Sequence, residues 1–298
     1  MNNVSVIIPT WNREQTLGKA IQSALEQTHP PLEVLVCGVE GTPDKKVVES
    51  IDDSRVRWVE VNHTGLPATP RNRGIRVSRG EWLAFLDSDD EWLPEKLEKQ
   101  FEHIDKTRCN AVCSDAIRYV PSQGHIGTIV NGDVSGDLLS FPLLIHINYV
   151  ICSSVLIKKD IVEKCNGFPE DRELRALEDY AMWLRAYTFT DFAFIKEPLL
   201  IYRDEQKTSV RAFSSTIWDQ RVNVLKSFIS WANNFEGDSN SKEYLDMAKR
   251  LLLRTQAEKI LHTQAENVNY YLKAMNSKIK SWIKKLEFYT PLNSIIPR

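Results

Sequence analysis

Short apolar runs alternate with amphipathic stretches along the first 90 residues of the chain. Runs rich in β-branched side chains predict strands at residues 4–8, 33–37 and 56–61. Apolar side chains at helical spacing predict helices at residues 16–27, from 44 to about 52, and from 70 onward. With a further apolar run at 81–86, strand and helix alternate four times, which is typical of a mostly parallel sheet with right-handed crossovers.

The alternation loosens after Leu97. We expect strands at residues 111–113, 117–120 and 155–157, and a closing strand pair at 192–195 and 199–202 around Pro198. Helices are predicted at residues 159–164 and 178–186, with a loop or short helix at 133–145. From residue 218 to 289 the pattern is helical, and the break at 203–213 separates an α/β domain (1–210) from a helical C-terminal region (211–298).

The apolar run at 81–86 leads directly into three carboxylates, Asp87, Asp89 and Asp90. A buried strand that ends this way delivers its acids to the carboxyl edge of the sheet, where open α/β sheets bind ligands. An Asp-x-Asp pair offers the hard oxygens that Mg²⁺ or Mn²⁺ prefers, and such ions usually accompany phosphates. The alternative is a solvated turn in which Asp89 or Asp90 caps a helix that begins near Trp92.

Composition narrows the class of protein. The 298 residues are 42% hydrophobic and 26% charged, which indicates a folded protein, and the net charge of −2 gives no reason to expect a nucleic-acid partner. The five cysteines are odd in number and mostly flanked by apolar residues, so we expect free thiols in a reducing compartment. We find no signal-peptide pattern and no apolar run of membrane-spanning length, and we expect a cytoplasmic protein.

Several short motifs, in a fixed order over about 200 residues, resemble inverting family 2 glycosyltransferases of the GT-A fold. They lie at residues 6–13 (VIIPTWNR), 70–75 (PRNRGI), 80–90, 166–170 (NGFPE), 178–185 and 202–203. The resemblance implies a Rossmann-like GT-A domain with a helical appendage that uses a nucleotide-sugar donor, most often a UDP-sugar, with Mn²⁺ or Mg²⁺. The acceptor it implies is a hydroxyl of a glycan or lipid-linked oligosaccharide in bacterial surface polysaccharide synthesis, such as O-antigen or capsule.

The resemblance also indicates which residues bind the donor. It implies that Asp89 is the direct metal ligand, that Asp87 serves the ribose and the metal, and that Ser88 lies between them. The other expected donor contacts are Pro9, Thr10, Asn12 and Arg13 after the first strand, Arg71 and Asn72 at a helix start, and Arg203. Helix starts favour anions, and the alternative for Arg71 is a surface ion pair. Pro9 would equally fit a turn, and Asp90 a helix cap.

Glu178 and Asp179 form the second centre. An inverting transfer needs a base that takes the proton of the acceptor hydroxyl. The resemblance implies Asp179 for that role, with Glu178 orienting or binding the acceptor. The alternative is that two acids at a helix start only complement the helix dipole.

The chain departs from the family pattern at two positions. The family's second strand usually ends in an Asp that binds uracil, whereas this strand ends in Gly38, so that Glu40 is the nearest acid. The family often has a His shortly after the Tyr-Arg pair, and here none follows Arg203. Arg203 or Lys207 is the expected source of positive charge in its place.

The C-terminal helical stretch carries apolar residues spaced by four and three, at Val268, Leu272, Met275, Ile279, Trp282, Leu286 and Tyr289. Five lysines stand on its other faces against the single acid Glu287. Such a stripe fits peripheral contact with an anionic membrane. It fits equally a heptad-like seam that packs on the catalytic domain or on a second protomer, as in a homodimer.

Two other functions compete with glycosyl transfer. Phosphatases of the haloacid dehalogenase type also carry a strand ending in Asp-x-Asp, but they place it near the chain start and follow it with Thr or Val, and neither holds here. A non-catalytic nucleotide- or sugar-binding module of the same fold would tolerate the missing Asp and His. The presence of Asp89 and Asp179 argues for an enzyme.

Overall fold

The computed structural model describes residues 3–130, 134, 136–204, 216–235 and 239–287, and beyond residue 264 it describes little more than the backbone. Four parallel strands, in the order β3-β2-β1-β4, form the first half of one sheet. Their bounds are β1 (Val4–Pro9), β2 (Glu33–Val39), β3 (Val56–Val61) and β4 (Trp82–Phe85). The helices between them are α1 (Glu14–Leu25), α2 (Asp44–Glu49) and α3 (Ala68–Val77), as in the predicted Rossmann-like half.

The second half of the sheet is mixed and continues in the order β9-β6-β10-β5. β6 (Ala111–Val120) and β10 (Phe192–Arg203) are parallel, whereas β9 (Leu156–Lys158) is antiparallel to both of its neighbours. Three short strands pair antiparallel at the margin, β5 (Glu91–Trp92), β7 (Gly124–Thr128) and β8 (Leu138–Leu139). The predicted α/β class is confirmed.

Two local predictions were wrong, and a third was incomplete. Residues 111–113 and 117–120 were expected as two strands but belong to the single strand β6. Residues 192–195 and 199–202 likewise belong to the single strand β10, because β6 and β10 pair along most of their length. Their register shifts at Pro198, which has no N–H to donate. The helix expected near Trp92 begins only at α4 (Lys96–Thr107), so neither Asp89 nor Asp90 caps it. The stretch at 133–145 includes both β8 and a short helix α5 (Phe141–Leu144).

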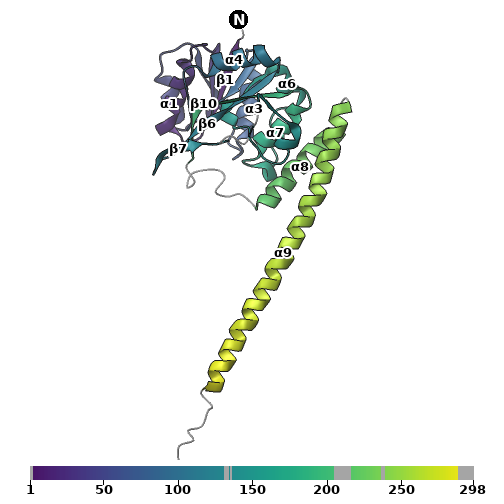
Figure 1. Cartoon of the computed structure of the whole chain (residues 1–298). Helices are drawn as coiled ribbons and strands as arrows, with labels where there is room; N and C mark the ends of the chain where they lie inside the picture. The colour runs from purple at the N-terminus through teal and green to yellow at the C-terminus, as the bar shows by residue number, and fades with distance from the viewer. Residues whose placement is uncertain (1–2, 131–133, 135, 205–215, 236–238, 288–298) are drawn as a thin grey trace, which may run out of the picture.

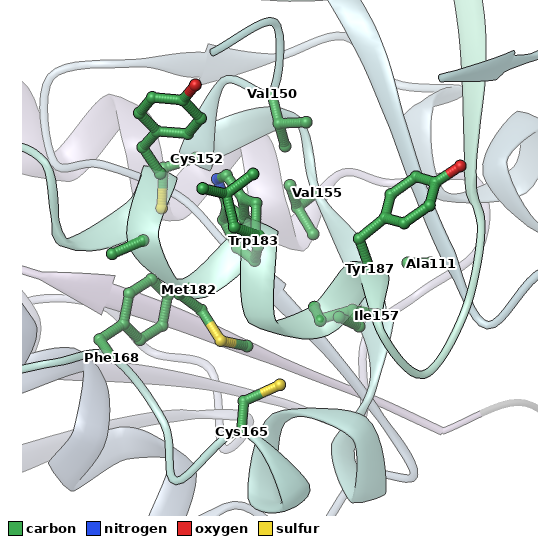
Figure 2. Close-up of a cluster of buried hydrophobic side chains, with 14 of the residues drawn as sticks. Ala111, Val150, Cys152, Val155, Ile157, Cys165, Phe168, Met182, Trp183 and Tyr187 are labelled. Atoms are coloured by element: carbon green, nitrogen blue, oxygen red, sulfur yellow. The ribbon is translucent and has the colours of Figure 1, made fainter. Parts of the chain in front are cut away.

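Helices cover both faces of the sheet (Figure 1). On one face α1, α2 and α4 pack against alternate strand residues such as Val6 and Ile8. On the other face lie α3, α6 (Lys159–Lys164) and α7 (Glu178–Tyr187), with the fully buried Trp183 at the centre of a cluster that Figure 2 shows. Phe85, Phe168 and Phe192 surround its indole with centroids 5.6 to 6.2 Å away. All five cysteines are buried and free, as expected.

Two helices follow the α/β body. α8 (Ile217–Asn233) packs against α7, and α9 (Ser239–Glu287) packs along α8 and then continues away from the body (Figure 1). The predicted domain boundary at residue 210 lies outside the described residues. Among the helices that the structure describes, none combines the length and apolarity needed to cross a bilayer.

Candidate active site

A cleft of about 690 Å³ opens at the carboxyl ends of β1 and β4. Its walls come from the loop after β1, the segment 61–67 after β3, the acidic loop 87–89, residues 151–152, the start of α7 with the residues before it, and the end of β10. The residues that line it include most of the predicted site, namely Pro9, Thr10, Asn12, Arg13, Arg71, Asp87, Ser88, Asp89, Glu178, Asp179 and Arg203. The fold thus brings the donor-binding candidates and the candidate base to one cavity.

The acidic loop presents two of its three carboxylates to this cleft. Asp87 is paired with Arg71, and Asp89 lies 3.6 Å from an Arg13 nitrogen. Burial, and after it the charge of Asp87, raises the pKa of Asp89 above its ordinary value. The third acid, Asp90, is buried below the cleft, where its oxygens accept hydrogen bonds from Ser153 Oγ (2.5 Å) and from the backbone N of Arg203 (2.9 Å). Its role is structural, although it caps no helix.

The donor set of this loop fits a divalent cation that is shared with a phosphate ligand. Among the described residues, no group of three or more His, Cys, Asp or Glu side chains is arranged to hold a metal by itself. Mg²⁺ is commonly held by one or two carboxylates together with substrate phosphates. Asp87 and Asp89, which both line the cleft, are the two carboxylates available for such a cation.

Arg71 on α3 is buried, which excludes the surface ion pair that we considered. Its Nη1 donates to Glu178 Oε1 at 2.7 Å, and its Nη2 donates to Asp87 Oδ1 at 2.6 Å. The guanidinium lies in the wall of the cleft, but both terminal nitrogens already serve protein carboxylates. It therefore joins the acidic loop to the start of α7.

Asn72 was expected to contact the donor, but the structure does not place it in the lining of the cleft. Its Nδ2 donates to Phe168 O (2.8 Å) and to Glu170 Oε1 (2.7 Å), while its Oδ1 accepts from Phe168 N at 2.9 Å. These bonds hold the turn at Gly167, whose φ of +68° suits glycine and where a Cβ would lie 2.5 Å from Asn72 Oδ1. Asn72 is thus a structural residue on the side of α3 away from the cleft.

Glu40 was also expected at the nucleotide, but the structure does not place it in the lining of the cleft. Its carboxylate is exposed and accepts from Lys45 Nζ at 2.8 and 2.9 Å, outside the cleft. Beside Gly38 the ring of Trp58 fills the space that a side chain would need. The buried acid near this strand end is Asp44 of α2, which accepts from Thr10 Oγ1 (2.9 Å) and from Arg13 N (2.7 Å). Sequence reasoning missed it, although an Asp in a first helical turn after a strand–loop unit is a usable signal.

The loop after β1 forms another part of the cleft wall. Asn12 has a φ of +54°, and this left-handed residue turns the chain between β1 and α1. Trp11, which is 54% exposed, stacks on His63 with ring centroids 4.6 Å apart. His63 belongs to the segment 61–67, which no motif in the sequence marked as part of a site.

Glu178 and Asp179 lie at the start of α7, after Ala176, which has a φ of +64°. Glu178 is 4% exposed, and its Oε2 is buried with no hydrogen-bond partner among the described residues. A buried acceptor atom without a partner is costly, so this oxygen in the cleft wall suits a hydroxyl donor from a ligand. The Oδ1 of Asp179 accepts from Tyr180 N at 2.7 Å, which fixes one edge of its carboxylate.

At the end of β10 the Arg203 guanidinium stacks over the Tyr119 ring, 5.0 Å from its centroid. Its side chain adds positive charge to the cleft wall beside the acidic loop, because its backbone N is bonded to Asp90. Lys207, the other cation considered, lies outside the described residues. Arg175, Ile151 and Cys152 also line the cleft and carried no signal in the sequence.

Comparison with known proteins places the chain. It matches the family described as Glycosyl transferase family 2 over residues 5–165. The UDP-Glc:alpha-D-GlcNAc-diphosphoundecaprenol beta-1,3-glucosyltransferase WfaP of Escherichia coli is 28% identical over 185 residues, which cover 62% of this chain and 70% of WfaP. The putative teichuronic acid biosynthesis glycosyltransferase TuaG of Bacillus subtilis is 36% identical over 110 residues, 36% of this chain but only 43% of TuaG.

Among solved structures, residues 1–349 of S. aureus TarS in complex with UDP-GlcNAc superpose with a TM-score of 0.66. The two chains are 17% identical, and the match covers 82% of this chain and 70% of that one. At this identity the likeness shows a shared GT-A fold.

Proposed function

The chain belongs to glycosyl transferase family 2, and on that premise we propose that it moves a sugar from a UDP-sugar to an acceptor hydroxyl, with inversion and with Mn²⁺ or Mg²⁺ bound. The observation that carries the proposal is the cleft in which Asp87 and Asp89 stand with Asp179 and Glu178. One pair of acids suits the diphosphate side of a donor, and the other suits the attacking hydroxyl.

The donor side is supported by the two carboxylates and by Arg13 and Arg203 around them. A cation held by Asp87 and Asp89 would neutralise the charge that builds on the diphosphate as the glycosidic bond breaks. Thr10 and Arg13 contact the nucleotide in this proposal, which is supported by their position in the cleft lining and by the bonds of Asp44 to their loop. The choice of UDP rests on WfaP, whose name includes UDP-Glc, and on TarS, whose structure was solved in complex with UDP-GlcNAc.

The acceptor side is supported by the start of α7. Asp179 takes the proton from the acceptor hydroxyl as its oxygen attacks the anomeric carbon, while the nucleoside diphosphate leaves from the opposite face. Glu178 cannot share this task freely, because one of its oxygens is held by Arg71. Its unpartnered Oε2 instead accepts a hydroxyl of the bound sugar or acceptor.

The acceptor class follows from the relatives. WfaP is named for a diphosphoundecaprenol-linked GlcNAc acceptor, and TuaG for teichuronic acid biosynthesis. We therefore include a glycan or lipid-linked oligosaccharide acceptor of surface polysaccharide synthesis, O-antigen or capsule, in the proposal. A protein with such an acceptor would work in the cytoplasm at the inner face of the membrane.

The direction of α9 supports contact with that surface. The helix continues past α8 and away from the α/β body (Figure 1), and five lysines against one glutamate lie between residues 268 and 289. The side chains of the apolar stripe lie outside the described residues.

Membrane contact is tested by sedimentation with vesicles. Vesicles of phosphatidylglycerol should sediment the protein and vesicles of phosphatidylcholine should not, and changing the five lysines to glutamine should abolish the difference. A concentration-dependent dimer without lipid binding would favour the seam between protomers instead.

The donor site is tested by thermal unfolding with UDP, GDP, dTDP and CMP, each with and without Mn²⁺, on the wild type and on Asp89→Asn. A ligand at about 100 times its Kd stabilises by about 2.7 kcal/mol, which moves the midpoint by several degrees. We expect the shift with UDP, only with Mn²⁺, and not in Asp89→Asn. If none of the four nucleotides shifts the midpoint of thermal unfolding, the proposed donor site is refuted.

A non-catalytic module of the same fold remains the competing function, and the same preparation distinguishes it. Such a module would bind UDP with Mn²⁺ but would release no UDP from a UDP-sugar in the presence of acceptor. An enzyme releases UDP under these conditions, and the rate of UDP release depends on Asp179.

A further inference from the structure

The acidic loop is supported from below by a short 3₁₀ turn, η1 (Cys152–Ser154). Ser153 is fully buried, and it is absent from the lining of the cleft. Its Oγ accepts a hydrogen bond from Asp87 N at 3.0 Å and donates one to Asp90 Oδ2 at 2.5 Å. A single hydroxyl thus joins the first and the last residue of the loop 87–90.

A second link, within the backbone, also joins residues 87 and 90. Asp90 N also donates to Asp87 O at 3.0 Å, which makes residues 87–90 a tight turn. The second oxygen of the Asp90 carboxylate accepts from the backbone of Arg203 at 2.9 Å, so the turn is tied to the end of β10. Asp87 and Asp89 project from a turn whose two ends depend on Ser153.

The turn η1 is itself held from the side of α4. The indole of Trp92 donates to Ser153 O at 2.7 Å, and the side-chain amide of Gln100 donates to Ser154 O at 2.7 Å. All of these groups are buried, so their bonds do not compete with water. The Ser153 hydroxyl is therefore held at a fixed point.

We infer that Ser153 is a positioning residue, whose hydroxyl sets the relative placement of Asp87 and Asp89 for the cation and diphosphate of the donor. A hydroxyl is suited to this point because one small group accepts and donates at the same time. Alanine would leave the Asp87 amide and one Asp90 oxygen without this partner. The inference rests on the proposed function for its ligand, but the support of the loop itself does not.

Ser5, near the amino end of the central strand β1, offers a matched control. It is also fully buried, and its Oγ accepts from a backbone amide (Gly80 N, 2.8 Å) and donates to a buried carboxylate (Glu33 Oε1, 2.7 Å). It lies near the start of β1, whereas the cleft is at the carboxyl end of that strand. Ser5→Ala and Ser153→Ala therefore remove the same kind of hydroxyl, one far from the acidic loop and one beneath it.

The experiment compares Ser153→Ala, Ser153→Thr and Ser5→Ala with the wild type in the full chain. Without ligand, hydrogen–deuterium exchange of a peptide that spans residues 86–91 should be faster in Ser153→Ala only. With UDP and MnCl₂, the Mn²⁺ concentration for half-maximal thermal stabilisation should rise about tenfold in Ser153→Ala, as is typical when a group that orients a metal ligand is removed. Ser153→Thr keeps the hydroxyl and should stay nearer to the wild type in both measurements.

The inference is overturned if Ser153→Ala matches Ser5→Ala in both the exchange of residues 86–91 and the Mn²⁺ midpoint. A wild type that binds no UDP would instead refute the proposed donor site. The exchange measurement would then still show whether Ser153 holds the loop.

Discussion

Arg71 and Glu178 form a buried ion pair in the wall of the cleft, with Nη1 and Oε1 2.7 Å apart. The same guanidinium reaches Asp87, so the carboxylate of the acidic loop and that of α7 share one cation. Removing one partner of a buried pair leaves an uncompensated charge, which costs far more than the pair contributes when intact. This relationship makes Arg71 the residue whose loss the site tolerates least.

We expect Arg71→Met to lower the free energy of unfolding by about 3–5 kcal/mol, because Glu178 is left buried and charged. Chemical denaturation measures the loss. The double variant Arg71→Met/Glu178→Gln should recover part of it, since the neutral amide needs no counter-charge. Arg57→Met, which removes a half-exposed partner of Glu33, is the control and should cost less than about 1 kcal/mol. Equal losses for the two arginines would contradict the prediction.

Asp179→Asn should separate binding from chemistry. The amide keeps the size of the side chain and cannot take a proton, so we expect the rate of UDP release in the presence of acceptor to fall by about 10²–10⁴-fold. The stabilisation by UDP and Mn²⁺ should stay as in the wild type. Asp171→Asn, at an exposed acid outside the cleft lining, should retain activity. Turnover in Asp179→Asn equal to that of the wild type would show that Asp179 is not the catalytic base.

Gly38→Ala tests whether the Trp58 ring firmly occupies the space beside Gly38 at the end of β2. An added Cβ would lie 2.3 Å from the Trp58 ring and 2.9 Å from Thr10 Cγ2. We expect a loss of about 1–3 kcal/mol from overpacking, and weaker UDP binding because Thr10 must move. Trp58→Leu in the same chain should relieve the loss.

Gly18→Ala is the control for this substitution. At Gly18 on α1 an added Cβ meets only Val47 Cγ1, at 3.7 Å, so alanine should be neutral or stabilising by up to about 1 kcal/mol. A Gly38→Ala variant as stable as Gly18→Ala would show that Trp58 yields easily.

The first half of the fold was predictable because its strands are buried on both faces. Such strands appear in the sequence as continuous apolar runs, and β1, β2 and β4 are clear examples. The acids after β4 were predictable for the same reason, since charge that follows directly on a buried strand must emerge at the sheet edge. The strand across Pro198 was not, because pairing with β6 overrides a local break.

Roles within a motif were harder to predict than the motif itself. Arg71 and Asn72 are neighbours in the sequence, but successive residues of a helix point about 100° apart. One therefore reaches the cleft, while the other holds the turn at Gly167. Ser153 carried no signal at all, because its partners lie more than 60 residues away.

A last prediction concerns Lys96, which is fully buried at the start of α4. Its ammonium donates to Gln100 Oε1 at 2.8 Å and lies 4.1 Å from the centre of the Trp92 ring, and no carboxylate among the described residues forms an ion pair with it. Burial lowers the pKa of Lys96 well below its ordinary value. In the unfolded chain the same group holds its proton up to about pH 10.5.

Between the lowered pKa and about pH 10.5 the unfolded state binds one more proton than the folded state, so stability must rise with pH across that window. Lys96→Met removes the ammonium group, and with it this contribution to the pH dependence of stability, and keeps an apolar side chain of similar length. We therefore expect the wild type to gain stability relative to Lys96→Met as the pH rises toward 10.5, as measured by urea denaturation at several pH values. Lys19→Met, at an exposed position of α1, should show no such trend. If the difference between wild type and Lys96→Met stays constant with pH, then Lys96 keeps its proton in the folded protein, and the contacts with Gln100 and Trp92 outweigh its burial.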